Sequence, residues 1–166
     1  MLIYVIGALV ALCALHLLLT FALIRRVRTL QDMLSGPDQQ MLAVGTPIDT
    51  FEASTPRGDT LTDAALRDTS VVVGFFRAGC GPCERMRGAL VDAPPAIPVI
   101  AFVAGTEQDP AARELLSSLG QVARVAYVNE RDPVHRVFAP PAFPSFYRVD
   151  NGVVRATGHQ LTDVVP

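Results

Sequence analysis

The chain lacks lysine and tryptophan, and it has only three cysteines among 166 residues. Since all 14 basic residues are arginine, Schiff-base chemistry and lysine-dependent phosphate binding are excluded. With a formal net charge of −2, the chain has no excess of positive charge, so we expect no nucleic-acid partner. Three cysteines are too few for a scaffold held together by disulfides, and a single C-x-x-C pair in a cysteine-poor domain favours catalytic use.

Apolar residues make up half of the chain, and they gather at the N-terminus. Residues 2–24 are interrupted only by Gly7, His16 and Thr20, and a run of this length can span the hydrocarbon core of a bilayer. A cleaved signal peptide would need a basic segment before the run and a small-x-small site after it, and a lipoprotein would need a small residue before Cys13. Neither pattern is present, so we predict an uncleaved transmembrane anchor over residues 1–24.

Three arginines, Arg25, Arg26 and Arg28, follow this span at once, and the positive-inside rule would then place the rest of the chain in the cytoplasm. We interpret residues 25–41 as a stalk or linker. The spacing of its apolar residues fits a continuation of the membrane helix and fits equally well a helix lying on the lipid headgroups. A folded domain is expected over residues 42–166.

The folded part is organised around residues 71–83. A short β-branched and aromatic run there predicts a buried strand that delivers Cys80 to the start of a helix. Free backbone N–H groups and the positive end of the helix dipole favour a thiolate at that position, so Cys80 is the candidate nucleophile. Cys83 lies one helical turn later, within reach of a reversible disulfide. Between them stand Gly81 and Pro82, and a proline suits the first helical turn, where a missing N–H costs nothing.

Further along, strand and helix patterns alternate. The sequence predicts an extended segment over 44–53, a turn at 57–59, helices over 61–66, 81–91 and 111–119, strands over 97–104 and 122–128, and a hairpin of 146–149 and 153–156. Alternation of this kind implies right-handed crossovers in a parallel sheet, whereas the Asn151-Gly152 turn implies an antiparallel pair. The fold class is therefore α/β, with a central mixed sheet and flanking helices.

A C-G-P-C motif after an apolar strand resembles the active site of the thioredoxin superfamily, which implies a thioredoxin-like fold preceded here by one transmembrane helix. The resemblance covers about residues 42–160 and is greater to membrane-anchored bacterial thiol-disulfide oxidoreductases of the TlpA and ResA type. Residues 44–51 and 58–61 look like that group's entry hairpin. The apolar span running into residues 25–30 is especially similar to the methylamine-utilisation MauD-like subgroup. This likeness implies a single-pass protein of the cell membrane with its redox domain outside the cytoplasm. The positive-inside rule, applied to the three arginines, predicts the opposite side.

In this superfamily a cis-proline lies opposite the dithiol, and the segment 142–146 is the matching one. The resemblance implies that Pro144 is cis and that the backbone of Phe143 pairs with an extended substrate peptide. Pro140 and Pro141 are the rival positions.

Departures from the family pattern accompany this match. Gly79 stands where an aromatic residue usually precedes the first cysteine, and Gly74 aligns with a buried acid that serves thioredoxin as proton acceptor. Glu84 is adjacent to Cys83, but a carboxylate that faces solvent would not serve, so the sequence identifies no proton acceptor for Cys83. Arg77 or Arg85 would favour a Cys80 thiolate if close to it. The family's closing helix corresponds here to residues 161–166.

The function predicted is that of a membrane-tethered thiol-disulfide oxidoreductase of the protein disulfide reductase type, which reduces or isomerises disulfides in partner proteins. It needs no cofactor or metal; its partners would be a disulfide- or thiol-containing protein, an upstream membrane or soluble electron donor, and membrane lipid. A metallochaperone-like module using His135 or His159 and a non-catalytic anchored module are the alternatives. A peroxiredoxin is disfavoured because Phe76 and Cys80 replace the proline and threonine of its motif.

Overall fold

The structure is a computed structural model that describes residues 40–165 without a gap and, near the N-terminus, Met1 and residues 4, 6–7, 9, 12–14 and 16–22. The chain divides into two compact units, Met1–Gln39 and Gln40–Pro166. Every described residue from 4 to 22 is helical. The predicted anchor over 1–24 lies partly, and the stalk over 25–41 almost wholly, outside the described residues. Among those that are described, no helix has the length and the apolar character needed to cross a membrane.

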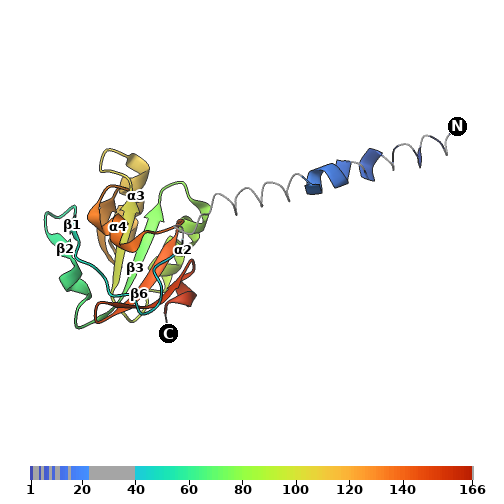
Figure 1. Ribbon diagram of the computed structural model, residues 1–166. Helices are drawn as coiled ribbons and strands as arrows, with labels where there is room; N and C mark the ends of the chain where they lie inside the picture. Colours follow the sequence, from blue (N-terminus) through green and yellow to red (C-terminus); the bar gives the residue numbers. More distant parts are fainter. Residues whose placement is uncertain are drawn as a thin grey trace. The chain divides into compact units, whose positions relative to one another are not determined.

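The second unit contains a five-stranded mixed sheet and a separate two-stranded one (Figure 1). Its elements, in chain order, are β1 (Glu52–Ser54), β2 (Thr60–Thr62), the 3₁₀-helix η2 (Asp63–Leu66), β3 (Ser70–Arg77), α2 (Gly81–Asp92), β4 (Val99–Ala104), α3 (Pro110–Leu119), β5 (Arg124–Val128), α4 (Pro133–Phe138), β6 (Ser145–Asp150), β7 (Val153–Gly158) and the 3₁₀-helix η3 (Leu161–Asp163). The strand order of the large sheet is β5-β4-β3-β6-β7. Strands β3, β4 and β5 are parallel, and β6 runs antiparallel to both β3 and β7. The predicted mixed α/β architecture is confirmed.

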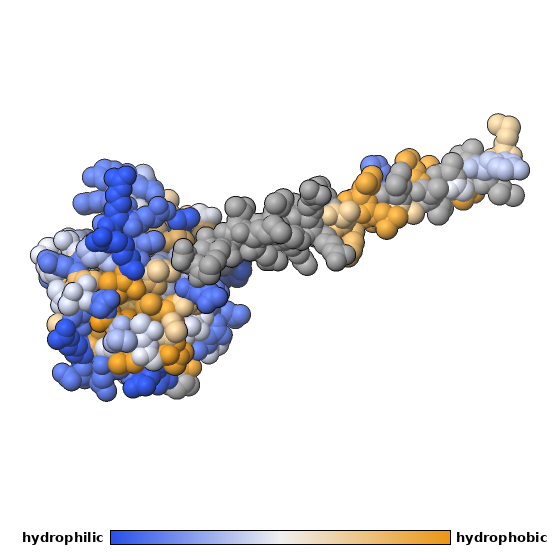
Figure 2. Space-filling model, in the orientation of Figure 1, coloured by the Kyte–Doolittle hydropathy of each residue, from blue (hydrophilic) through white to orange (hydrophobic). Residues whose placement is uncertain are grey.

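Side chains alternate across the sheet, so that each face has its own apolar core. On β3, Val71, Val73 and Phe75 join one core, which is closed by residues of β1, β2, η2 and α4. Val72 and Phe76 join the other, which is closed by α2, α3 and the C-terminal segment. Burial on both faces explains why β3 reads as a continuous apolar run. In the view of Figure 2, most of the surface of this unit is polar, with smaller apolar areas.

Several element boundaries differ from the sequence prediction, and for three of them the structure shows the reason. Leu61 belongs to β2 instead of a helix, because it pairs with Ala53 and is fully buried there. The fourth strand begins after Pro98, which lacks the N–H that a ladder needs. The fifth begins at Arg124, because residues 122 and 123 still donate hydrogen bonds to the carbonyl of Leu119.

Helix α4 was not predicted at all. It carries the same start signal as α3, an aspartate at the N-cap followed by proline, but it is only six residues long. The helix packs because Val134 and Phe138 are fully buried, and the hydroxyl of Tyr147 donates to the carbonyl oxygen of Phe138 at 2.9 Å. Burial raises the pKa of Tyr147 well above that of a free tyrosine.

Candidate active site

The end of β3 delivers the dithiol to the edge of the sheet. Gly79 follows the strand with φ of +71°, a conformation that side-chain-bearing residues rarely adopt, and it turns the chain into α2. Cys80 is the N-cap of that helix, and Pro82 lies in its first turn. The predicted change from strand to helix at Cys80 is therefore confirmed.

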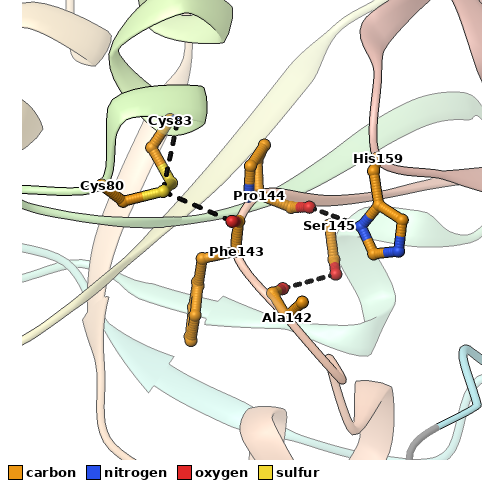
Figure 3. Close-up of a disulfide and its surroundings, with 7 residues drawn as sticks. All are labelled: Cys80, Cys83, Ala142, Phe143, Pro144, Ser145 and His159. Carbon is orange, nitrogen blue, oxygen red and sulfur yellow. Dashed lines mark hydrogen bonds between the residues drawn. A yellow bond between two sulfur atoms is a disulfide. The ribbon is translucent and has the colours of Figure 1, made fainter. Parts of the chain in front are cut away.

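The two cysteines form a disulfide with their Cα atoms 5.2 Å apart. Cys80 is half-buried at the rim, whereas Cys83 is fully buried in the core between α2 and the sheet. The backbone N–H of Cys83 donates to Cys80 Sγ at 3.3 Å (Figure 3). Because an N–H group can only donate, this bond stabilises a thiolate on Cys80, as does the helix N-terminus. Of the two sulfurs, Cys80 is therefore the more exposed, and its surroundings are the ones that favour a thiolate.

A second segment reaches the dithiol from the start of the neighbouring strand, β6. Strand β6 pairs with β3 so that Ser145 lies opposite Phe75, which places the residues just before Ser145 beside the end of β3. Within that segment the peptide bond between Phe143 and Pro144 is cis, as the sequence resemblance implied. Pro144 is buried, and the cis bond makes it, instead of the rivals Pro140 and Pro141, the cis-proline of this segment.

The carbonyl oxygen of Phe143 lies 3.3 Å from Cys80 Sγ (Figure 3). Since a carbonyl can only accept, this contact favours the protonated thiol of Cys80 and opposes the effect of the Cys83 N–H group. The guanidinium carbon of Arg77 lies 4.3 Å from the centroid of the Phe143 ring, in cation–π geometry. Arg77 thus acts on the site by holding Phe143, a role that the sequence does not indicate.

The carbonyl groups on either side of Phe143 are also bonded. The buried hydroxyl of Ser145 donates to the carbonyl oxygen of Ala142 at 2.7 Å. His159 Nδ1 lies 2.8 Å from the carbonyl oxygen of Pro144. Three consecutive carbonyl groups of this loop, at residues 142, 143 and 144, therefore each have a different partner, as Figure 3 shows.

An open groove adjoins Cys80 on the side of α4. Its part nearest the sulfur has a volume of about 330 Å³ and is lined by Arg77, Glu130, His135 and residues 140–143. It continues over the carboxyl ends of β3, β4 and β5, where ligands bind in open α/β sheets. His135, one of the two histidines of the metallochaperone alternative, is half-buried on α4.

No protein-family model and no curated protein sequence matches the chain. Solved structures do match it. The thioredoxin domain of a thiol-disulfide oxidoreductase from Bacteroides vulgatus is 16% identical, with a TM-score of 0.61 over 74% of this chain and 93% of that one. A thiol:disulfide interchange protein of the thioredoxin family from Chlorobium tepidum is 20% identical, with a TM-score of 0.52 over 70% and 87%. A secreted Mycobacterium tuberculosis disulfide oxidoreductase, homologous to Escherichia coli DsbE, is 19% identical, with a TM-score of 0.51 over 70% and 87%.

The chain has a thioredoxin-like fold. One departure from the thioredoxin pattern, the glycine in place of the buried acid, has a structural reason. A Cβ atom on Gly74 would lie 2.8 Å from the ring of Phe76 and 3.1 Å from that of Phe146, so no acidic side chain fits there. Glu84 pairs with Arg87 at 2.8 Å on an exposed part of α2. Neither residue offers a carboxylate to Cys83.

Among the residues that the structure describes, no three histidine, cysteine or acidic side chains lie together as metal ligands would. The site residues that the sequence did not reveal are Ser145 and the pair of His159 with Pro144. Ser145 follows the proline directly, and a hydroxyl there that bonds a carbonyl three residues back is a turn motif recognisable in hindsight. His159 carried no such signal, because its partner lies 15 residues away.

Proposed function

We propose that this chain is a membrane-tethered thiol-disulfide oxidoreductase of the TlpA and ResA type, related to the MauD-like subgroup, that reduces or isomerises disulfides in partner proteins. One observation carries the proposal. Cys80 Sγ lies between a helix N-terminal N–H group and the carbonyl of Phe143, at the mouth of an open groove, while its disulfide partner Cys83 is buried behind it.

The reaction follows from this arrangement. In the reduced chain the Cys80 thiolate attacks one sulfur of a partner disulfide; a bond forms between the two sulfurs, and the other partner sulfur leaves as a thiolate. The sulfur of Cys83, once deprotonated, then attacks Cys80 Sγ and displaces the first partner sulfur. Two electrons pass from the dithiol to the partner, and the Cys80–Cys83 disulfide seen in the structure is the oxidised product.

An extended partner segment would lie in the groove beside Phe143. The preceding residue of a cis-proline turns its backbone toward the sulfur, where it can pair with the partner as a short added strand. A dithiol reductant, membrane-bound or soluble, would have to return two electrons for each turnover. We place Phe143 and Pro144 in substrate binding and Gly81 and Pro82 in the geometry of the motif.

The reduction potential of the Cys80–Cys83 pair in the full-length chain tests this proposal, with Cys80→Ser as the control that cannot form the couple. A potential close to about −270 mV, as in thioredoxin, would support a reductase that is fed by an upstream donor. A potential near about −120 mV would instead make the chain a disulfide-forming oxidant. If no reversible couple exists, the chain is a binding module and the proposal is wrong.

The side of the membrane on which the redox domain lies needs a separate experiment. We propose that residues 1–24 anchor the chain and that the redox domain faces away from the cytoplasm, where partner disulfides are formed. In intact cells, a membrane-impermeant maleimide should then label Cys80 after mild reduction, in a Cys13→Ser background. Labelling only after the membrane is opened would place the domain in the cytoplasm, as Arg25, Arg26 and Arg28 favour.

A further inference from the structure

The contact between His159 and the cis-proline loop has a defined chemistry. His159 Nδ1 lies 2.8 Å from the carbonyl oxygen of Pro144 (Figure 3). A carbonyl oxygen has no proton to give, so Nδ1 must carry the proton and donate it. Whether Nε2 is protonated as well does not alter this donor.

The chain holds His159 in place through its backbone. The carboxylate of Asp163 accepts from the backbone N–H groups of His159 at 3.1 Å and of Gln160 at 2.9 Å. Asp163 approaches so closely that a Cβ atom on Gly158 would lie 2.3 Å from it, so the position before His159 has no room for a side chain. The backbone of His159 is therefore held at the end of β7, and the exposed imidazole is held by its bond to the carbonyl oxygen of Pro144.

The bond from His159 helps to hold the cis-proline loop, residues 142–145, next to Cys80. Ser145 bonds the carbonyl of Ala142, and His159 bonds the carbonyl of Pro144, so the peptide groups before and after the Phe143–Pro144 peptide are held. The contact of the Phe143 carbonyl with Cys80 is a separate one and does not involve His159. The same backbone is the edge that an extended partner would pair with.

We propose that His159 is a positioning residue of the reaction, which orients the Phe143–Pro144 backbone for the partner segment by donating its Nδ1 proton to Pro144. The inference rests on the proposed oxidoreductase function. His159 touches neither sulfur in the structure and acts through the loop alone. Its loss should therefore weaken partner binding and leave the chemical step at Cys80 nearly unchanged.

A matched pair of substitutions isolates the proton donor. In His159→Asn the side-chain amide nitrogen occupies nearly the place of Nδ1 and can still donate, whereas His159→Leu has a similar shape and no donor. The reduced full-length chain, in a Cys13→Ser background, is mixed with increasing amounts of a disulfide-bonded peptide, and single-turnover oxidation is followed. We expect His159→Leu to raise the half-saturating peptide concentration about fivefold, the usual effect of one lost hydrogen bond, with the limiting rate within about twofold of the parent. His159→Asn should recover most of the binding.

Three outcomes would overturn the assignment. An unchanged half-saturating concentration in His159→Leu would show that the bond does not orient the partner site, and an equal defect in both variants would show that the imidazole only fills space. A fall in limiting rate at unchanged half-saturation would indicate general structural damage. If the parent chain is not oxidised by the peptide, the oxidoreductase function fails; ¹⁵N NMR of the parent then still decides the geometry, because an Nδ1 without a proton refutes the hydrogen bond itself.

Discussion

Selective alkylation of the reduced dithiol tests whether the fold makes the sulfur of Cys80 more reactive than that of Cys83. Cys80 Sγ accepts an N–H bond at 3.3 Å and caps a helix, while Cys83 is fully buried. A hydrogen bond to a charged acceptor contributes about 1.5–3 kcal/mol and a helix N-terminus about 0.3–1 kcal/mol. The Phe143 carbonyl, which favours the thiol, removes about 1 kcal/mol. The net preference for a Cys80 thiolate is about 2 kcal/mol, or about 20-fold in its population at neutral pH.

We therefore expect iodoacetamide to alkylate Cys80 at least about 20-fold faster than Cys83, since burial also slows the second sulfur. The assay is a short pulse on the reduced full-length chain in a Cys13→Ser background, followed by peptide mapping. In concentrated urea the two rates should become similar, because both sulfurs are then solvated. Equal rates in the folded chain, or a ratio that survives unfolding, would refute the argument from the helix N-terminus.

The remaining predictions concern the supports of the site. Gly74→Ala should lower the free energy of unfolding by about 1–3 kcal/mol, because the new methyl group overpacks two aromatic rings. The same change at Gly88, where nothing lies within 4 Å of a Cβ, should raise it by about 0.5–1 kcal/mol, and urea titration compares the two. Tyr147→Phe should cost about 1–2 kcal/mol by leaving a buried carbonyl unpaired. Because burial raises the pKa of Tyr147, the parent should also lose stability as the pH rises above about 10, and this variant should lose less. Arg77→Leu should weaken partner binding about two- to fivefold through the lost cation–π contact with Phe143, and Arg77→Lys should retain part of it.

The dithiol half of the site could be predicted from the sequence because all of its signals are local. The apolar run of β3, the turn at Gly79 and the proline in the first turn of α2 lie within 13 consecutive residues. Each one acts on its immediate neighbours, so strand, turn and helix N-terminus follow from residue type. The neighbouring strand also follows, because the alternation of strand and helix implies that β4 lies parallel to β3.

Two of the mispredicted segments, Leu61 and α4, have a common cause. Leu61 looks helical by spacing but pairs across a hairpin, and α4 is stable because Val134 and Phe138 enter a core built by distant strands. In both places tertiary burial overrides a short local pattern. Short segments are affected most, because few residues contribute to their intrinsic preference for helix or strand.

The loop half of the site depends on contacts that no local pattern encodes. Family resemblance located Pro144, but the bonds that hold the loop come from Arg77 at the end of β3 and from His159 after β7. These residues are brought together because β6 lies between β3 and β7 in the sheet, so the loop that enters β6 is flanked by the ends of both neighbours. Any chain with this strand order places three separate segments around the cis-proline. The residue types at those three ends therefore decide how firmly the loop backbone is held, while the C-G-P-C motif decides only which sulfur has surroundings that favour a thiolate.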